Sequence, residues 1–290
     1  TAIAFLHPDD PPDHFPDPAC AARSPDGLLA MGGDLTPERL LAAYRRGIFP
    51  WYEEGQPILW WSPDPRAVLL PGALHVSRSL RRTLRNDRYR VSVDLAFDRV
   101  IDACASTRAA TGTWITAAMR SAYLQLHQLG HAHAIETWLG SDLVGGLYGI
   151  ALGGVFFGES MFSLETDASK VALVHLVRLA EARGMKLIDC QVATGHLASL
   201  GSQLMPREQF LTAVRMLTAA PVPPGPWHES PAPTSVLVPP RTGSGTGANT
   251  MGICNACRAS SASGSTEKPV VPTTAPVPCR AHAATWARLP

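Results

Sequence analysis

The chain has 290 residues, of which 46% are hydrophobic, and its formal net charge at pH 7 is +1. That length supports one or two domains with a substantial core, and the balanced charge excludes a global field that attracts nucleic acid. The most apolar stretch, residues 143–158, is too short and too rich in glycine to span a membrane, and the amino end lacks the apolar core of a signal peptide. We therefore expect a cytoplasmic protein that is not bound to a membrane. We also expect a monomer, although none of these properties decides the oligomeric state.

The cysteines do not indicate a metal site. Cys20, Cys104 and Cys190 are scattered, which is typical of a reduced cytoplasmic protein. Cys254 and Cys257 form a single Cys-x-x-Cys pair, which supplies half of a zinc site, and no convincingly spaced second half follows. We expect neither a metal nor a cofactor.

Residues 1–65 are predicted to form a small N-terminal domain, or a cap on the domain that follows. Thr36 has the position of an N-cap, Pro37 suits the first helical position, and Gly47 ends a helix over 36–46. The adjacent Trp60 and Trp61 follow in an extended segment. Because neighbouring side chains of a strand point to opposite faces, we expect that only one of them points inward.

Residues 66–217 alternate between helical and strand patterns. The apolar spacing predicts helices over 79–86, 95–105, 116–129 and 169–183. It predicts a hairpin of strands over 133–139 and 143–150, and further strands over 154–162 and 186–191. This order is typical of an α+β domain built on a mixed sheet.

Residues 218–290 are predicted to form a disordered tail. Half of the 26 prolines lie beyond residue 220, among many serines, threonines and glycines. Such a composition buries too little apolar surface to offset the entropy of ordering the chain. We expect that deleting 221–290 leaves folding nearly intact.

Three polar residues stand in apolar surroundings near the predicted strand ends. Alternation along a strand predicts that Asp189 and Gln191 point the same way, with Cys190 on the opposite side. Glu159 is a second acid in an apolar segment, where an unpaired carboxylate is costly. An acid beside an amide suits the handling of an amine or a carbonyl. The alternative is structural, because each carboxylate could cap a helix or pair with an arginine.

A basic helix face follows from arginines spaced at i, i+3, i+4 and i+7, namely Arg78, Arg81, Arg82 and Arg85. Arg88 and Arg90 extend the cluster, and Asp87 is the one acid within it. Clustered arginine side chains bind phosphates in a bidentate manner, which favours contact with RNA. The alternative is a solvated helix surface.

Aromatic and apolar side chains provide candidate binding surfaces. Prolines and glycines place Trp51 and Trp114 on loops, where an aromatic face can stack on a base. Met161 is a candidate for an apolar pocket because methionine adapts to guests of different shapes. Both kinds of residue are also common as plain core.

Several segments together resemble one known family, the bacterial leucyl/phenylalanyl-tRNA–protein transferases. The matching segments occur in order along the chain and include Gly27–Leu35, Gly47–Trp51, Ile58–Arg66, Thr113–Ile115, Leu143–Gly146, Gly158–Ser163, Ala168–Lys170 and Asp189–Gln191. The resemblance implies a GNAT-like (acetyltransferase-type) fold after the small N-terminal domain, and a chain that ends soon after Leu211.

The resemblance also implies an activity and a site. Members transfer Leu or Phe, and less well Met, from aminoacyl-tRNA to proteins with N-terminal Arg or Lys, which marks them for degradation through the N-end rule. The implied catalytic residues are Glu159, Asp189 and Gln191. The implied binding residues are Tyr44, Trp51 and Trp114 for the aminoacyl-adenosine, Phe156, Met161, Leu173 and Leu176 for the amino-acid side chain, and Arg78, Arg81, Arg82 and Arg85 for tRNA phosphates.

Two other functions are compatible with parts of this pattern. A coenzyme A-dependent N-acyltransferase shares the implied fold, but the loop 163–170 has two acids and no glycine with which to cradle a pyrophosphate. A non-catalytic RNA-binding protein would use the arginines and tryptophans but would not need Asp189 and Gln191. For Glu159, two roles remain open: holding the acceptor's cationic side chain, or supporting Asp189.

Overall fold

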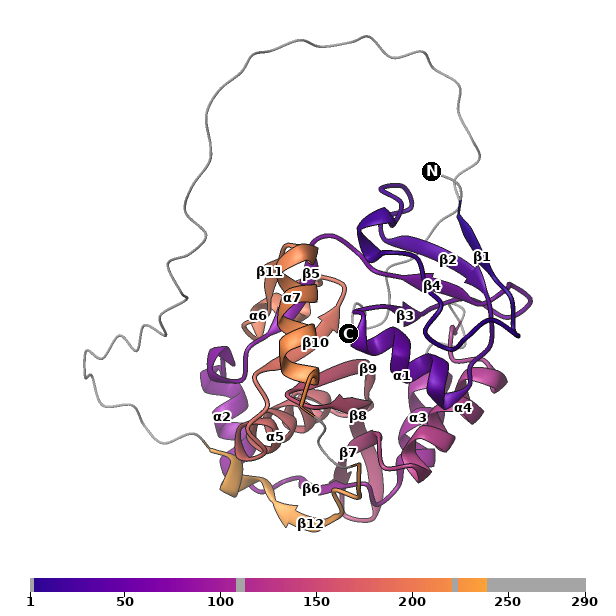
Figure 1. The fold of residues 1–290 in the computed structure, drawn as a ribbon. Coiled ribbons are helices and arrows are strands. Elements are labelled where there is room, and N and C mark those ends of the chain that lie inside the picture. Colours follow the sequence, from indigo (N-terminus) through magenta and orange to yellow (C-terminus); the bar gives the residue numbers. More distant parts are fainter. Residues whose placement is uncertain (1–2, 108–112, 221–223, 239–290) are drawn as a thin grey trace, which may run out of the picture. The chain divides into compact units, whose positions relative to one another are not determined.

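The computed structural model describes residues 3–107, 113–220 and 224–238, which form two β-sheets with helices packed against them (Figure 1). The smaller sheet has the strand order β1-β2-β4-β3. Its strands are β1 (Ala4–Leu6), β2 (Leu28–Gly32), β3 (Phe49–Pro50) and β4 (Leu59–Trp61), and helix α1 (Pro37–Arg45) connects β2 to β3. β1 runs parallel to β2, and the pairs β2–β4 and β3–β4 are antiparallel.

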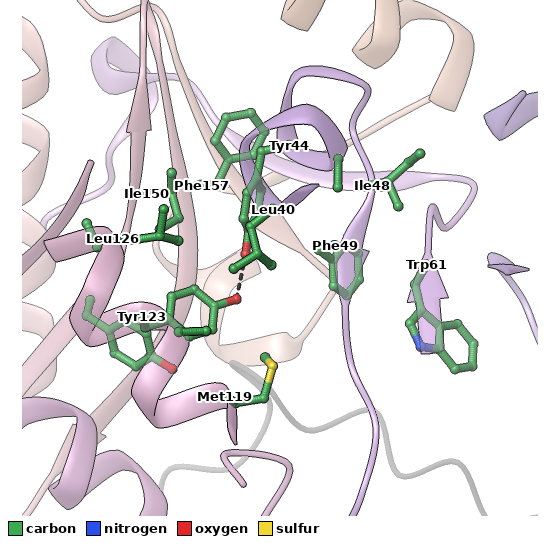
Figure 2. Packing of buried hydrophobic residues seen from close by; sticks show 14 of the residues in the cluster. Leu40, Tyr44, Ile48, Phe49, Trp61, Met119, Tyr123, Leu126, Ile150 and Phe157 are labelled. Atoms are coloured by element: carbon green, nitrogen blue, oxygen red, sulfur yellow. Dashed lines mark hydrogen bonds between the residues drawn. The ribbon is translucent and has the colours of Figure 1, made fainter. Parts of the chain in front are cut away.

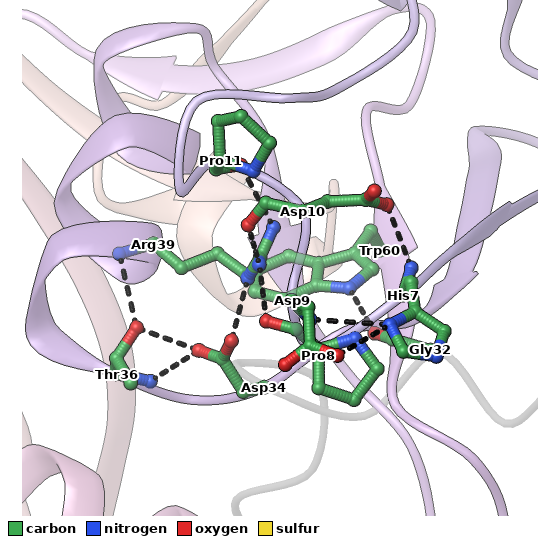
Figure 3. Close-up of polar contacts among 10 residues, drawn as sticks. All are labelled: His7, Pro8, Asp9, Asp10, Pro11, Gly32, Asp34, Thr36, Arg39 and Trp60. Atoms are coloured by element: carbon green, nitrogen blue, oxygen red, sulfur yellow. Dashed lines mark hydrogen bonds and ion pairs between the residues drawn. The ribbon is translucent and has the colours of Figure 1, made fainter.

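Helix α1 begins at the predicted cap, because the Thr36 hydroxyl accepts the backbone N–H of Arg39 at 3.4 Å. The Arg39 side chain is buried and ties the amino-terminal segment to the sheet (Figure 3). Its Nε donates to Asp34 at 3.1 Å, and its two Nη atoms donate to the backbone carbonyls of Pro8, Asp10 and Pro11. A proline-rich segment has few N–H groups to offer a sheet, so carbonyl contacts to one arginine hold it instead.

The expectation that only one of Trp60 and Trp61 points inward is wrong, since both are buried. Trp60 packs on the Phe15 ring with 4.9 Å between centroids, and Trp61 packs on the Trp51 ring at 5.4 Å. Their indole N–H groups donate to the backbone carbonyls of Gly32 and Trp51, respectively. The two side chains lie on opposite faces of β4, as alternation requires, but the protein covers both faces.

The larger sheet is mixed and has the strand order β11-β5-β10-β9-β8-β7-β6-β12. Within it β9 and β10 run parallel, and the other described pairs are antiparallel. Its strands are β5 (Arg66–Leu69), β6 (Arg90–Val93), β7 (Ala132–Leu139), β8 (Asp142–Leu152), β9 (Val155–Ser163), β10 (Leu187–Gln191), β11 (Gln203–Met205) and β12 (Glu229–Pro233).

The remaining helices include the four that the sequence predicts in this domain. They are α2 (Arg78–Arg85), α3 (Phe97–Ser106), α4 (Ala117–Gln128), α5 (Ala168–Ala182), α6 (Gly195–Ser199) and α7 (Arg207–Thr218), with short 3₁₀ turns at Pro18–Cys20, Pro71–Ala73 and Thr234–Leu237. The last two α-helices were not predicted. None of the described helices combines the length and apolar character that crossing a bilayer requires.

Two hydrophobic clusters divide the core. One contains the buried side of α1, α3, α4 and α7, and the other contains that of α2 and α5. The α+β class, with a small N-terminal sheet followed by a mixed sheet, is confirmed. The first cluster also includes residues of the smaller sheet, so the two sheets share a core.

The predicted tail begins too early. Residues 224–238, which we expected to be disordered, carry β12, which pairs with β6, and a 3₁₀ turn. Trp227 is buried and stacks on His133 with 4.0 Å between ring centroids, and the Thr234 hydroxyl donates to the Leu84 carbonyl at 2.9 Å. The composition of this segment misled the prediction, because the segment forms little structure within itself. It is ordered by backbone hydrogen bonds to the open edge of β6. Residues 239–290 lie outside the described part of the chain.

We accordingly expect two truncations to differ. A chain ending at Val238 keeps Trp227 and β12, whereas a chain ending at Ala220 loses them. Removing a buried tryptophan typically costs ~3–5 kcal/mol, so the shorter chain should unfold roughly 10 °C lower in a thermal scan. Equal melting temperatures would mean that residues 224–238 add nothing to stability.

Candidate active site

The predicted polar residues meet where β9 and β10 stop pairing. The parallel register runs from Leu187 opposite Val155 to Asp189 opposite Phe157. β9 continues beyond that point to residue 163 and β10 to residue 191, without further pairing between them. Glu159 on β9 and Gln191 on β10 therefore lie at the opening between two diverging strands.

A β-bulge places Glu159 in this opening. Gly158 pairs with Gly149 and Ser160 pairs with Tyr148, so Glu159 is an extra residue on β9. A bulge re-aims a side chain and shifts the alternation of the residues after it. For that reason Phe156 and Met161, although an odd number of positions apart, both belong to the core cluster on the α5 side.

Glu159 is buried and receives three hydrogen bonds. The Tyr44 hydroxyl donates to its Oε1 at 2.7 Å, the Tyr123 hydroxyl to its Oε2 at 2.8 Å, and the Gln191 Nε2 to its Oε1 at 2.9 Å. Burial raises the pKa of Glu159 to about 7, although both tyrosine hydrogen bonds oppose the rise. Glu159 thus holds the amide of Gln191 and makes no direct contact with Asp189 among the described interactions.

The two tyrosine hydroxyls also lie 2.6 Å from each other (Figure 2). Burial and the Glu159 carboxylate raise the pKa of both hydroxyls well above the ordinary value, so both keep their protons. Tyr44, Tyr123 and Glu159 form a triangle with three contacts. Two hydroxyl protons satisfy two of these contacts, and a third proton, on Glu159, completes the ring. The cluster can therefore hold two or three protons near neutral pH.

Asp189 pairs with an arginine, as the structural alternative predicted. Arg66 at the start of β5 donates from Nε to Oδ1 at 2.8 Å and from Nη2 to Oδ2 at 2.7 Å, and both side chains are buried. The Asp189 Oδ1 also accepts the backbone N–H of Gln191 at 2.8 Å. Asp189 is thus held by Arg66 and in turn holds the backbone of Gln191.

Gln191 does not reach the site by regular strand alternation. Its φ is +61°, and the pairing of β10 with β5 shifts register between Asp189 and Gln191. Asp189 and Gln191 lie close together, but regular strand alternation, from which we predicted that they point the same way, is not the cause. Because the Gln191 Nε2 donates a hydrogen bond to Glu159, the Oε1 of the same amide faces away from Glu159. The Gln191 Oε1 is buried and has no hydrogen-bond partner among the described residues.

The three predicted aromatic residues occupy different positions. Tyr44 is buried, and its hydroxyl belongs to the Glu159 cluster rather than to an open stacking face. Trp51 is half-buried against Trp61. Trp114 is buried just before α4, and its indole N–H has no partner among the described residues. Close to both tryptophans in sequence, Tyr52 and Thr116 line a hollow of about 690 Å³.

The predicted side-chain pocket is fully packed. Phe156 and Met161 from β9, and Leu173 and Leu176 from α5, are all buried in the core cluster on the α5 side. Tyr44, Tyr123 and Trp114 belong to the other cluster. The two predicted groups therefore lie in different parts of the core.

The predicted basic face is exposed over most of its length. Arg78, Arg82 and Arg85 are exposed on α2, while Leu80 and Leu84 are buried beneath them. Arg81 is half-buried, and its Nε donates to the Val76 carbonyl at 3.2 Å. The two arginines predicted to extend this face have partners within the protein. Arg88 pairs with Glu165, and Arg90 donates to the Pro231 carbonyl.

Sequence reasoning missed Arg66 and Tyr123 as members of the site. Arg66 did leave a signal, because it is a single charge directly before the apolar run 67–70. Tyr123 lies on the buried side of an ordinary amphipathic helix, where nothing distinguishes it from core.

Comparison with known proteins identifies the family. The family model described as "Leucyl/phenylalanyl-tRNA protein transferase" matches residues 68–215, and the corresponding N-terminal domain model matches residues 33–64. Leucyl/phenylalanyl-tRNA–protein transferases from Chromohalobacter salexigens and Aromatoleum aromaticum are each 59% identical to the chain. The protein belongs to the leucyl/phenylalanyl-tRNA–protein transferase family. It is therefore an enzyme of the aminoacyltransferase class.

The match covers most of each relative. The alignment with the Chromohalobacter protein spans 75% of this chain and 86% of the relative, and that with the Aromatoleum protein spans 73% and 90%. Among solved structures, a GCN5-related N-acetyltransferase from Kribbella flavida is 13% identical over 59% of this chain and 61% of its own, with a TM-score of 0.30. That score is too low to bear on fold or function.

The raised pKa of Glu159 predicts how stability depends on pH. Its folded value of about 7 exceeds the ordinary 4.5, so the folded state binds the proton more tightly than the unfolded state does. Stability should fall by about 3 kcal/mol between pH 4.5 and 7 on this account alone. In urea titrations Glu159→Gln should remove that share of the slope, and exposed Glu38→Gln should leave it in place. An unchanged slope in Glu159→Gln would mean that the carboxyl ionises normally.

Proposed function

We propose that this enzyme transfers Leu or Phe, and less well Met, from aminoacyl-tRNA to the N-terminal Arg or Lys of acceptor proteins, which marks them for degradation. The observation that carries the proposal is the placement of Gln191. Its backbone is held by Asp189 and its Nε2 by Glu159, which leaves Oε1 as the unpartnered acceptor in a buried site. Family membership supplies the substrate class.

The reaction forms a bond between the acceptor's α-nitrogen and the aminoacyl carbonyl carbon, and breaks the ester bond to the terminal ribose. The ribose oxygen leaves with a proton, and the amine loses one. The Gln191 Oε1 accepts a hydrogen bond from the attacking amine and so aligns it with the ester. Glutamine is too weak a base to take the proton at neutral pH.

Glu159 is the better candidate for handling that proton. Its pKa of about 7 matches the requirement for general acid–base catalysis at neutral pH, which typically contributes ~10²–10⁴-fold. Its proton completes the ring of contacts with Tyr44 and Tyr123, and when Glu159 is ionised both hydroxyls can still donate to it. Asp189, which Arg66 already engages through both oxygens, has a positional role.

The remaining residues would bind the aminoacyl-tRNA. Trp51 and Trp114 would hold the terminal adenosine, to which the buried Tyr44 would contribute only through its hydroxyl, and Phe156, Met161, Leu173 and Leu176 would receive the amino-acid side chain. The reaction centre at Glu159 and Gln191 would lie where β9 and β10 stop pairing. Because the pocket residues are packed, they must move to admit a side chain, and the flexible Met161 suits that requirement.

The contacts at the start of α5 disfavour coenzyme A. A pyrophosphate needs free backbone N–H groups at a helix N-terminus. Here the N–H of Ser169 donates to the Ser163 hydroxyl at 3.2 Å and that of Ala168 to the Glu165 carbonyl at 3.1 Å. A Cβ at Gly145 would lie 2.5 Å from the Ala168 Cβ, so β8 already fills the space beside this turn.

The direct test is transfer of labelled leucine from leucyl-tRNA to matched proteins that begin with arginine or glutamate. We expect label in the first and not in the second, because the predicted acceptor is cationic. Gln191→Ala should lower the rate by ~10²-fold or more while aminoacyl-tRNA affinity stays within a few-fold. Equal labelling of both acceptors would contradict the proposed substrate. Full activity in Gln191→Ala would contradict the assigned residue.

A separate prediction concerns the arginine face of α2. If Arg82 and Arg85 contact tRNA phosphates, replacing both with alanine should weaken binding and reduce the slope of log affinity against log salt by roughly one unit per lost contact. Arg88→Ala is the matched control, because Arg88 already pairs with Glu165. If the double variant keeps the slope of the wild type, these arginines do not contact phosphates and the face is ordinary solvated surface.

A further inference from the structure

Arg66 is a buried arginine with one polar partner in the described structure. Its guanidinium binds Asp189 through Nε and Nη2, and neither side chain is more than 1% exposed. The third nitrogen, Nη1, is buried without a hydrogen-bond partner among the described residues. Arg39, which is also buried, donates instead to one carboxylate and three backbone carbonyls.

Two aromatic rings fix the plane of the Arg66 guanidinium. Its central carbon lies 4.6 Å from the Phe49 ring centroid and 4.7 Å from that of Phe210. Phe49 belongs to β3 of the smaller sheet and Phe210 to α7, so two elements far apart in sequence converge on one side chain. A planar guanidinium stacks on aromatic faces in a way that lysine does not reproduce.

Gly47 allows the turn after α1 to pack closely against α7. Its φ is +66°, and a Cβ at this position would lie 2.5 Å from the Leu211 side chain and 2.8 Å from the Phe210 ring. Glycine is therefore required for the turn from α1 to bring Phe49 close to α7.

Stability alone explains this arrangement poorly. A buried ion pair often contributes little, since desolvating both charges offsets their attraction, and an unpartnered buried donor adds a further cost. What the pair does achieve is geometric. It fixes both carboxylate oxygens of Asp189, and Oδ1 accepts the backbone N–H of Gln191. The backbone of Gln191 has a left-handed conformation that a non-glycine residue rarely adopts.

We propose that Arg66 is a positioning residue for the transfer reaction, which holds Asp189 so that the backbone and amide of Gln191 stay aimed at the acceptor amine. Arg66 itself does not contact the substrate in this scheme. Phe49 and Phe210 clamp Arg66 in turn, so the smaller sheet contributes to the geometry of the reaction centre. The inference rests on the proposed function and deepens it.

The test compares Arg66→Lys with Arg39→Lys, a matched change of a buried arginine outside the site. Turnover and KM are measured with leucyl-tRNA and an acceptor that begins with arginine, at a temperature where circular dichroism shows both variants folded. Arg66→Lys should lower kcat by about 10²-fold with KM within about threefold, and Arg39→Lys should change kcat less than about twofold. If Arg66→Lys does not fold, Phe210→Leu removes one side of the clamp and should lower kcat by about tenfold.

A double-mutant cycle separates positioning from general damage. If Arg66 acts through Gln191, Arg66→Lys should cause little further loss in a Gln191→Ala background. Fully multiplicative losses, or a folded Arg66→Lys variant with near-normal kcat, would overturn the proposal.

Hydrogen exchange at the Gln191 backbone amide gives a readout that needs no activity. The amide should exchange at least about tenfold faster in Arg66→Lys than in the wild type, and unchanged protection would count against the inference. If the wild-type protein fails to label any acceptor, the proposed function fails, whereas the exchange result still decides whether Arg66 holds Asp189 and Gln191.

Discussion

Two carboxylates are buried beside one glutamine, and the geometry of the site depends on how each is stabilised. Glu159 is stabilised by two tyrosine hydroxyls and the Gln191 amide, and Asp189 by a bidentate arginine and the Gln191 backbone. An unpaired charge would be expelled from such an interior or neutralised. Because both acids bind Gln191, its backbone and side chain are constrained together, and only its Oε1 remains for a substrate.

The smaller sheet takes part in this arrangement. Tyr44 on α1 reaches Glu159, and Phe49 on β3 stacks on Arg66. The amino-terminal region is therefore not a separate cap placed over a finished site. Its core is continuous with that of the larger sheet, and two of its side chains complete the surroundings of the two acids. A change at Tyr44 or Phe49 should consequently be felt at Glu159 or Arg66.

The sequence predicted the regular elements because they depend on local patterns. Thr36 caps α1 as expected, the helices α2 to α5 lie within a few residues of the predicted ranges, and the β7–β8 hairpin turns where Gly140 and Ser141 allow it. It also selected Glu159, Asp189 and Gln191, since polar residues in apolar runs are unusual. It failed for Trp61 and for residues 224–238, where burial comes from partners far away in the chain.

The sequence by itself determined the α+β class, the order of the elements and the kinds of side chain available for chemistry. Only the tertiary structure decided that Asp189 pairs with Arg66, 123 positions away, and that Tyr123 shares Glu159 with Tyr44. It alone produced the bulge at Glu159 and the left-handed Gln191. The physical reason is that periodicity reports which face of an element is buried, whereas hydrogen-bond partners depend on strand order and register, which are fixed by packing across the whole domain.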